Sequence, residues 1–242
     1  MNLLIDVGNT RIKWAIDEDD TWSTGSCRFA GARLEALWGG LAVPSTIIVA
    51  SVVGSGFERE FRGWCQQRWA LNPIFVRPSR EQFGVCNHYA DPAQLGADRW
   101  AALIGARRFT TNAVLVVDCG TAVTIDALTA EGDFLGGVIF PGIELARGAL
   151  HQATHGIGQQ EAHRLELFGR STAAAVGAGV AYSVAGGIDR IVDEFARHIA
   201  PPVTVIITGG GADAVLGLLR HSVEYQPNLV LHGLAAWVRG VP

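Results

Sequence analysis

Two short segments of the chain combine an aspartate, a glycine and a threonine directly after an apolar run. The first extends from Asp6 to Lys13, and the second is Asp118-Cys119-Gly120-Thr121. A glycine lets the backbone approach a phosphate closely, a threonine hydroxyl can donate a hydrogen bond to it, and a carboxylate can hold a cation directly or through water. Each segment alone is also ordinary hairpin chemistry. Because both occur in matching contexts, we expect a clamp for phosphate groups.

The surroundings of the two segments match residue by residue. Leu4-Ile5-Asp6-Val7-Gly8 corresponds to Val116-Val117-Asp118-Cys119-Gly120, and after one gap at Asn9 the two threonines align. A repeat at about half the chain length is too long for a solenoid unit and indicates two similar domains. We therefore expect a first domain over residues 1–108 and a second over residues 109–242, each with one phosphate loop.

Apolar periodicity predicts the elements that must position these loops. The expected strands are apolar or β-branched runs over residues 3–7, 12–16, 46–53, 73–76, 113–117, 122–126, 134–139 and 203–207. The expected helices have helical spacing over residues 57–69, 96–109, 143–151, 173–199 and 212–219, while residues 77–95 are expected to be rich in loops. The mixture predicts an α/β fold.

A third glycine turn, Thr208-Gly209-Gly210-Gly211, follows the last expected strand. It also fits a dinucleotide fingerprint, but no acidic residue stands at the position expected to bind the ribose. We interpret it as a turn on the adenosine side of a nucleotide site, with a plain tight turn as the alternative.

Composition restricts the class of protein. With 49% hydrophobic and 17% charged residues among 242, the chain is expected to fold compactly. A net charge of −4 provides no basic footprint, so we expect neither nucleic acid nor a membrane as a partner. Four scattered cysteines without metal-site spacing, and first residues without a signal-peptide pattern, favour a cytoplasmic location. The charge-free segment 171–188 contains glycines and hydroxyls and is expected to be a packed helix.

Together with the two phosphate segments, Gly96-Ala97-Asp98-Arg99, residues 136–142 and residues 169–172 resemble the motif set of type III pantothenate kinase. This family, also described as the Bvg accessory factor family, lies in the acetate kinase/sugar kinase/Hsp70/actin superfamily. The resemblance implies duplicated ribonuclease H-like (actin-like ATPase) domains, each a mixed sheet with helices. It also implies a homodimer with the substrate site near the subunit interface.

The activity implied by this resemblance is the ATP-dependent phosphorylation of pantothenate to 4′-phosphopantothenate, the first step of coenzyme A biosynthesis. Magnesium (Mg²⁺) and a monovalent cation, potassium or ammonium (K⁺ or NH₄⁺), are the implied cofactors. The residues assigned to ATP are Asp6, Val7, Gly8, Asn9, Thr10, Arg11, Ile12, Lys13 and Thr121. The residues assigned to pantothenate are Tyr89, Gly96, Ala97, Asp98, Arg99 and, from the second subunit, Thr172.

The resemblance makes Asp98 the proton acceptor and Asp118 the ligand of the monovalent cation, while Asp6 would hold the divalent metal through phosphates or water. The residue types suit these roles, because a hydroxyl that attacks the γ-phosphate must lose a proton, which an aspartate can accept late. Arg99 could bind the pantothenate carboxylate with two parallel hydrogen bonds. Without the resemblance, Asp98 and Arg99 are equally a helix-terminal charge and a solvated arginine.

Two other functions remain open from the residues. A non-catalytic regulatory or accessory protein could have the same fold, and a phosphatase or nucleotide hydrolase could use the same phosphate clamp. Turnover that depends on pantothenate separates the kinase from both.

Overall fold

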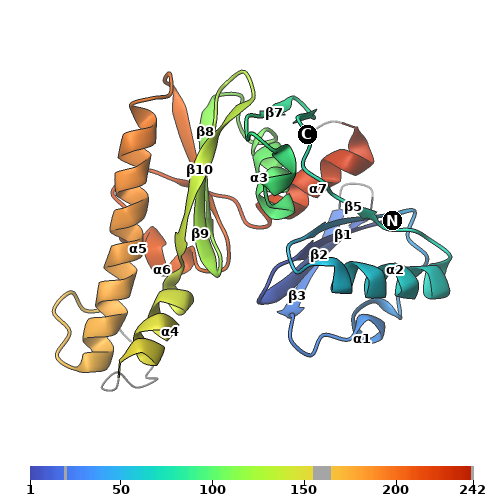
Figure 1. Ribbon diagram of the computed structural model, residues 1–242, viewed down its shortest axis with the longest axis horizontal. Coiled ribbons are helices and arrows are strands. Elements are labelled where there is room, and N and C mark those ends of the chain that lie inside the picture. The colour runs from blue at the N-terminus through green and yellow to red at the C-terminus, as the bar shows by residue number, and fades with distance from the viewer. Residues whose placement is uncertain (19–20, 155–164, 241–242) are drawn as a thin grey trace. The chain divides into compact units, whose positions relative to one another are not determined.

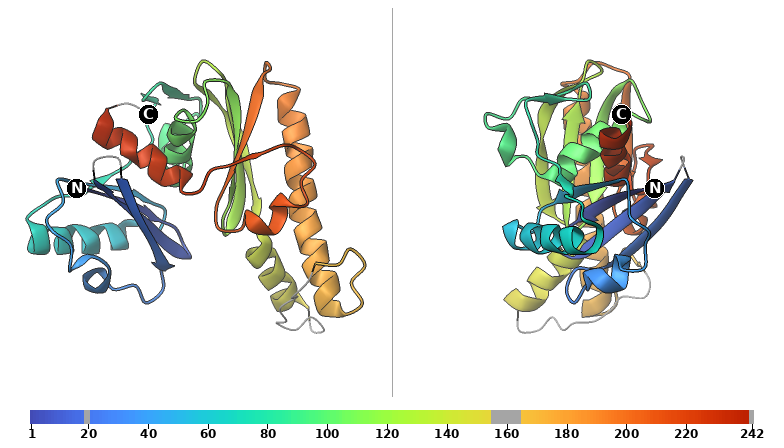
Figure 2. Two further views of the ribbon diagram at one scale, coloured as in Figure 1. Left: turned by 180° about the vertical axis from the view of Figure 1, so that it is seen from behind. Right: turned by 90° about the vertical axis from the view of Figure 1, so that its right-hand side faces the viewer.

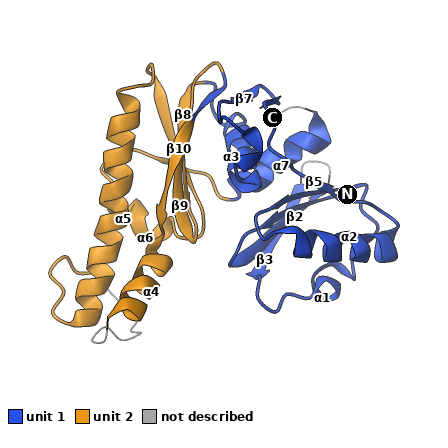
Figure 3. Ribbon diagram, viewed as in Figure 1, with its two compact units in different colours: residues 1–111, 132–135, 228–242 blue, residues 112–131, 136–227 orange. Residues whose placement is uncertain are grey.

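The computed structural model describes residues 1–18, 21–154 and 165–240. The chain forms two compact units (Figure 3): unit 1 comprises residues 1–111, 132–135 and 228–242, and unit 2 comprises residues 112–131 and 136–227. The C-terminal segment therefore belongs to unit 1. A division into two duplicated domains at residue 108 stays a prediction.

Unit 1 contains a mixed sheet whose strands lie in the order β3-β2-β1-β4-β5 (Figure 1). The strands are β1 (Asn2–Val7), β2 (Arg11–Glu18), β3 (Thr21–Arg28), β4 (Thr46–Ser51) and β5 (Ile74–Phe75). β2 pairs antiparallel with both β1 and β3, whereas β4 is parallel to β1 and β5 is parallel to β4. The hairpin expected around Gly8 is therefore confirmed.

Both faces of this sheet are buried at its central strands β1 and β4. One face packs against α1 (Leu34–Trp38) and α2 (Ser55–Trp69) through alternate strand residues such as Leu3 and Ile47. The residues between them, such as Leu4 and Ile48, are also fully buried. α7 (Leu229–Arg239) contacts β1 and β4 and packs along α3 (Ala97–Ala106), as Figures 1 and 2 show. β1 and β4 thus are continuous apolar runs because helices cover both of their faces.

Unit 2 repeats the strand arrangement of unit 1. Its strands are β8 (Ala113–Cys119), β9 (Ala122–Leu128), most of β10 (Asp133–Pro141), β11 (Val203–Thr208) and β12 (Glu224–Tyr225). They lie in the order β10-β9-β8-β11-β12, with β8 antiparallel to β9 and parallel to β11, and β12 parallel to β11. The order corresponds to β3-β2-β1-β4-β5, and the directions of β9, β8, β11 and β12 correspond to those of β2, β1, β4 and β5. The internal repeat expected from the sequence is therefore present in the topology.

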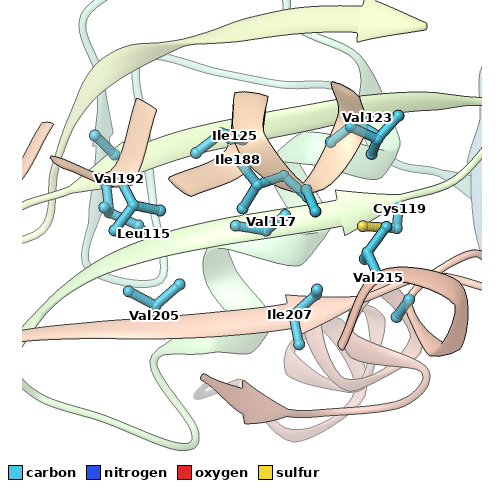
Figure 4. Packing of buried hydrophobic residues seen from close by; sticks show 14 of the residues in the cluster. Leu115, Val117, Cys119, Val123, Ile125, Ile188, Val192, Val205, Ile207 and Val215 are labelled. Carbon is cyan, nitrogen blue, oxygen red and sulfur yellow. The ribbon is translucent and has the colours of Figure 1, made fainter. Parts of the chain in front are cut away.

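The core of unit 2 lies between this sheet and α5 (Thr172–Ala196). Ile188 and Val192 of α5 pack over Leu115, Val117 and Ile125 of β8 and β9 (Figure 4). The unit also contains α4 (Ile143–Ala153) and α6 (Asp213–Leu216). Within the described ranges, no helix has the length and apolar content that a membrane crossing requires. Most of the charge-free segment 171–188 forms the first part of α5, and its residues Val184, Ala185 and Ile188 are buried in this core, so the packed helix expected there is present.

Candidate active site

The first of the two expected phosphate loops is the turn between β1 and β2. The Gly8 N–H donates to the Arg11 carbonyl oxygen at 3.0 Å, which closes the turn. Asp6 and Lys13 are direct cross-strand partners, and both are half-buried. Side chains opposite each other in an antiparallel pair lie on the same face, about 5 Å apart at Cβ. The turn thus presents a carboxylate and an ammonium group side by side.

The other residues of this loop divide into buried and exposed ones. Val7 and Ile12 are fully buried in the core of unit 1, so only their backbone can contact a nucleotide. Asn9 and Thr10 are exposed at the tip, and the Thr10 carbonyl oxygen accepts from the Phe29 N–H at 2.9 Å. These contacts hold the tip of the loop against the residues that follow β3.

Arg11 is exposed, and its guanidinium contacts the neighbouring strand. Its Nη2 donates to Ser26 Oγ of β3 at 2.8 Å. A nucleotide phosphate that binds Arg11 would therefore compete with this hydroxyl for one donor of the guanidinium.

The second phosphate loop lies between β8 and β9 in unit 2. The Gly120 N–H donates to the Ala122 carbonyl oxygen at 3.0 Å, so this turn is one residue shorter than the first, as the gap at Asn9 predicts. Thr121 is exposed at its tip. Burial, assisted by the Asp118 charge, raises the pKa of the Cys119 thiol to about 12. Cys119 therefore remains a neutral core residue and supplies backbone groups only.

The glycine turn after β11 lies against Asp118. The Gly211 N–H donates to the Cys119 carbonyl oxygen at 2.8 Å, and Gly209 has a φ of 94°. A Cβ added to Gly209 would overlap both Asp118 Oδ1 and the Cys119 carbonyl oxygen. A carboxylate and a carbonyl oxygen therefore lie together beside this glycine, and oxygen donors of this kind suit a hard cation such as K⁺.

This contact predicts different results for two adjacent glycines. We expect Gly209→Ala to lower stability by about 1–3 kcal/mol, because alanine is strained at positive φ and its Cβ overlaps the oxygens around Asp118. Gly210→Ala is the matched control, since a Cβ there meets nothing within 4 Å. Thermal unfolding of both variants is the measurement, and equal loss of stability in the two variants would contradict this description of the turn.

The expected acceptor segment begins α3. Gly96 is the N-cap residue, and the space that a side chain would need there is filled by the Asp98 carboxylate. Asp98 Oδ1 accepts from the Arg99 N–H at 2.7 Å. Burial raises the pKa of the Asp98 carboxyl above its usual value, although the Arg99 N–H and guanidinium oppose the rise. A carboxylate with a raised pKa is a better proton acceptor than an exposed one.

Arg99 makes hydrogen bonds to both Asp98 and Tyr89, to the former through its backbone N–H and to the latter through its guanidinium. Arg99 is 8% exposed, and its Nη1 donates to Tyr89 Oη at 3.1 Å. The guanidinium carbon lies 5.9 Å from the centre of the Tyr89 ring and 6.0 Å from that of Phe134. The structure thus brings together three of the residues predicted for the acceptor, Tyr89, Asp98 and Arg99, while Ala97 is buried and offers only its backbone. Phe134 was not predicted.

Thr172 is the first residue of α5 in unit 2. It is exposed, and the preceding Ser171 caps the helix by accepting from the Ala174 N–H at 3.2 Å. The cap fixes the position of Thr172 on the helix. Its contribution to the site of a second subunit stays a prediction.

The comparisons with known proteins agree with one another. The sequence profile of the type III pantothenate kinase family matches residues 2–194. A type III pantothenate kinase from Halorhodospira halophila is 37% identical over 249 residues, covering 99% of this chain and 98% of the relative.

Two solved structures bear on the fold alone. A Campylobacter jejuni protein described as a Baf family transcriptional activator aligns with a TM-score of 0.62 at 20% identity, over 99% of this chain and 100% of that one. A ROK family glucokinase from Streptomyces griseus aligns with a TM-score of 0.50 at 13% identity, over 99% of each chain. These likenesses confirm the α/β fold with mixed sheets of the ribonuclease H-like class. By its profile match and by its identity to a relative over nearly the full length, the chain belongs to the type III pantothenate kinase family.

Proposed function

We propose that this protein transfers the γ-phosphoryl group of ATP to the primary hydroxyl of pantothenate, which yields 4′-phosphopantothenate and ADP at the first step of coenzyme A biosynthesis. A new bond forms between the substrate oxygen and the γ-phosphorus, and the bond from the γ-phosphorus to the bridging oxygen of ADP breaks. The hydroxyl proton passes to Asp98. Membership of the family, together with the buried Asp98 beside Arg99 and Tyr89, supports this proposal.

Asp98, Arg99 and Tyr89 have separate parts in the proposed reaction. Asp98 orients the hydroxyl and accepts its proton as the bond to phosphorus forms. Arg99 binds the pantothenate carboxylate, with Tyr89 holding the guanidinium in position through the hydrogen bond to its hydroxyl. The loop from Asp6 to Lys13 and the Thr121 turn hold the triphosphate, so positioning and charge stabilisation provide most of the rate increase.

The oxygen donors near the phosphate loops fit the two proposed cations. Among the described residues, no three His, Cys, Asp or Glu side chains gather into a metal cluster. Mg²⁺ usually binds through one or two carboxylates, substrate phosphates and waters, and Asp6 is the carboxylate that would hold it here. When bound, Mg²⁺ neutralises charge on the phosphate oxygens. Asp118 and the Cys119 carbonyl oxygen are the donors proposed for K⁺ or NH₄⁺.

A homodimer is part of the proposal, supported by exposed apolar side chains of unit 2. These lie on β10, on α4, just before α5 and on α5, and comprise Ile139, Leu145, Leu150, Leu167, Phe168 and Tyr182. α4 packs on α5, so part of this set lies on adjoining helices. A contiguous apolar patch is typical of an interface, and the exposed residues of the adjoining helices α4 and α5 are proposed to contribute to one. We propose a cytoplasmic location because all four cysteines are free thiols, which suits a reducing compartment.

Phe168→Asp is expected to weaken the dimer at least about tenfold, because burying a large apolar side chain contributes about 1.5–3 kcal/mol and the change occurs in both subunits. Phe168 is 83% exposed in the single chain. Val43→Asp is the matched control, since Val43 is 61% exposed in unit 1. Sedimentation velocity over a concentration series measures the effect. A monomeric unaltered chain would contradict the dimer, and unchanged association of Phe168→Asp would contradict this interface.

The activity is tested by ADP formation with ATP, Mg²⁺ and K⁺ or NH₄⁺, with and without pantothenate. We expect ADP release to depend on pantothenate. Phosphate release without it would favour a hydrolase, and a folded dimer without turnover under either cation would favour an accessory role.

A further inference from the structure

Arg80 binds the loop that carries Tyr89. This loop, residues 87–92, connects β7 (Val85–Asn87) to the short 3-10 helix Pro92–Gln94. Arg80 Nη1 donates to the carbonyl oxygens of Asn87 at 2.7 Å and Tyr89 at 3.0 Å, and Nη2 donates to that of Ala90 at 3.4 Å. One guanidinium therefore binds three carbonyl groups within four residues of chain. Hydrogen bonds from a charged donor are about twice as strong as neutral ones.

Asn87 holds the same loop from inside the protein. Its side chain is fully buried; its Oδ1 accepts from the Tyr89 N–H at 3.0 Å, and its Nδ2 donates to the Pro92 carbonyl oxygen at 3.3 Å. The Asn87 N–H donates in turn to the Arg80 carbonyl oxygen at 2.8 Å. The backbone on both sides of Tyr89 is thus fixed by these two residues together.

The Tyr89 side chain is fixed at its ring and at its hydroxyl. The ring lies 5.4 Å from that of Phe134, tilted by 33°, and Phe134 is fully buried next to Asn87 in the pairing of β10 with β7. The hydroxyl accepts from Arg99 at 3.1 Å. The position of the Tyr89 hydroxyl therefore depends on the position of the loop backbone. A shift of the loop would move this hydroxyl away from the Arg99 guanidinium.

We infer that Arg80 is a positioning residue for the pantothenate site. By binding the carbonyl groups of residues 87, 89 and 90, Arg80 fixes the position of the Tyr89 hydroxyl, and this hydroxyl orients the Arg99 guanidinium. Arg80 does not itself touch the substrate in this account. The inference rests on the proposed function, because it assigns Arg99 and Tyr89 to the acceptor. It predicts a selective effect on the acceptor, since Arg80 makes its hydrogen bonds to the Tyr89 loop alone among the predicted site segments.

The test compares the kinetics of Arg80→Ala, Arg80→Lys and a control. We expect Arg80→Ala to raise KM for pantothenate by about tenfold, as loss of charged hydrogen bonds would. KM for ATP should stay within about twofold and kcat should change less than KM, since uniform binding is what is lost. Arg80→Lys should recover part of the loss, because an ammonium can still donate to the same carbonyl groups. Arg68→Ala is the matched control: Arg68 also donates to a backbone carbonyl, that of Gly39, far from any predicted site residue in sequence.

A double-mutant cycle with Tyr89→Phe separates positioning from general loss of structure. If Arg80 acts through the Tyr89 hydroxyl, the effect of Arg80→Ala on KM should fall to about twofold or less in the Tyr89→Phe background. Fully additive effects, an equal rise in KM for ATP, or an unchanged KM for pantothenate would each overturn the inference. Absence of pantothenate-dependent turnover in the unaltered chain would instead overturn the proposed function, so the two failures are distinguishable.

Discussion

Asp98→Asn is expected to lower kcat by about 100- to 10,000-fold, the usual contribution of a positioned proton acceptor. The amide is close in size and its oxygen can still accept from the Arg99 N–H, as the carboxylate does at 2.7 Å. The substitution therefore removes the proton acceptor and keeps the local geometry. Initial rates at saturating ATP and pantothenate measure the loss. Activity within a few fold of the unaltered enzyme would eliminate Asp98 as the proton acceptor.

A matched control for this substitution is Glu35→Gln. Glu35 is also an acid in the first turn of a helix of unit 1, where its Oε2 accepts from Trp64 Nε1 at 3.1 Å. An amide oxygen can replace that acceptor, so turnover should remain within about twofold, as is usual for changes away from the reacting groups. If Glu35→Gln lost as much turnover as Asp98→Asn, removal of any helix-terminal acid would be sufficient to lower turnover, and the loss in Asp98→Asn would not indicate a proton acceptor.

The same carboxyl determines the expected pH dependence. Burial raises the pKa of Asp98, so kcat/KM should fall as the pH drops through a value above that of an ordinary aspartate. Because the pKa of Asp98 is higher in the folded state than in the unfolded state, the folded state binds the proton more tightly. The protonated Asp98 therefore stabilises the fold at pH values below the unfolded pKa, and this stabilisation is lost as the pH rises through the folded pKa. At neutral pH the buried charge is unfavourable, and Asp98→Asn should be at least as stable as the unaltered protein.

Gly233→Ala is expected to lower the free energy of unfolding by about 1–3 kcal/mol or more, as overpacking a tight contact does. A Cβ at this position of α7 would overlap the carbonyl oxygen and carbonyl carbon of Ala101 in α3, which are backbone atoms that cannot rotate away. Because the first turn of α3 contains Asp98 and Arg99, displacement of α7 should also lower turnover. Urea unfolding followed by circular dichroism gives the stability.

The control for α7 is Gly63→Ala in α2. A Cβ at Gly63 meets nothing within 4 Å, and the residue is exposed. An exposed glycine in a helix costs about 0.5–1 kcal/mol relative to alanine, so this variant should be more stable than the unaltered protein. An unchanged urea midpoint for Gly233→Ala would mean that α3 and α7 have room for a methyl group between Gly233 and Ala101, which would contradict this close contact.

Much of the fold could be predicted because the buried strands are continuous apolar runs that end in glycine turns. β1, β4, β8 and β11 were all predicted for this reason, and each is buried on both faces. β3 was missed because its residues are polar and mostly exposed at the edge of the sheet. α1, with five residues, is too short for a helical period to be recognised.

The C-terminal helix was also missed, for a different reason. α7 is buried over most of its length and contacts α3, β1 and β4, and His232 and Arg239 are its only polar side chains, so its sequence offers few polar positions from which a helical period could be recognised. Its membership of unit 1 depends on tertiary contacts between residues more than 100 positions apart in the chain, and no local pattern encodes them.

The candidate site residues could be named from the sequence where short motifs contain them, and their roles stay predictions. The two phosphate turns and the Asp98-Arg99 pair have fixed spacing, which sequence comparison detects. Arg80, Asn87 and Phe134 contact Tyr89 or its loop through hydrogen bonds with the backbone and through ring packing, and residue type alone gives no sign of such contacts. Residues 77–95 were expected to be rich in loops, and two short strands in this range, β6 (Glu81–Gln82) and β7, were not predicted.

The most direct test of the central claim is detection of the product by mass spectrometry. The purified protein would be incubated with ATP, Mg²⁺, K⁺ and pantothenate, and the phosphorylated product would be quantified against ADP. We predict that one molecule of 4′-phosphopantothenate forms for each ADP. Asp98→Asn should form both products only at the strongly lowered rate expected for that variant. ADP without phosphopantothenate, or neither product from a folded dimer in K⁺ or NH₄⁺, would contradict the assignment of this chain as a pantothenate kinase.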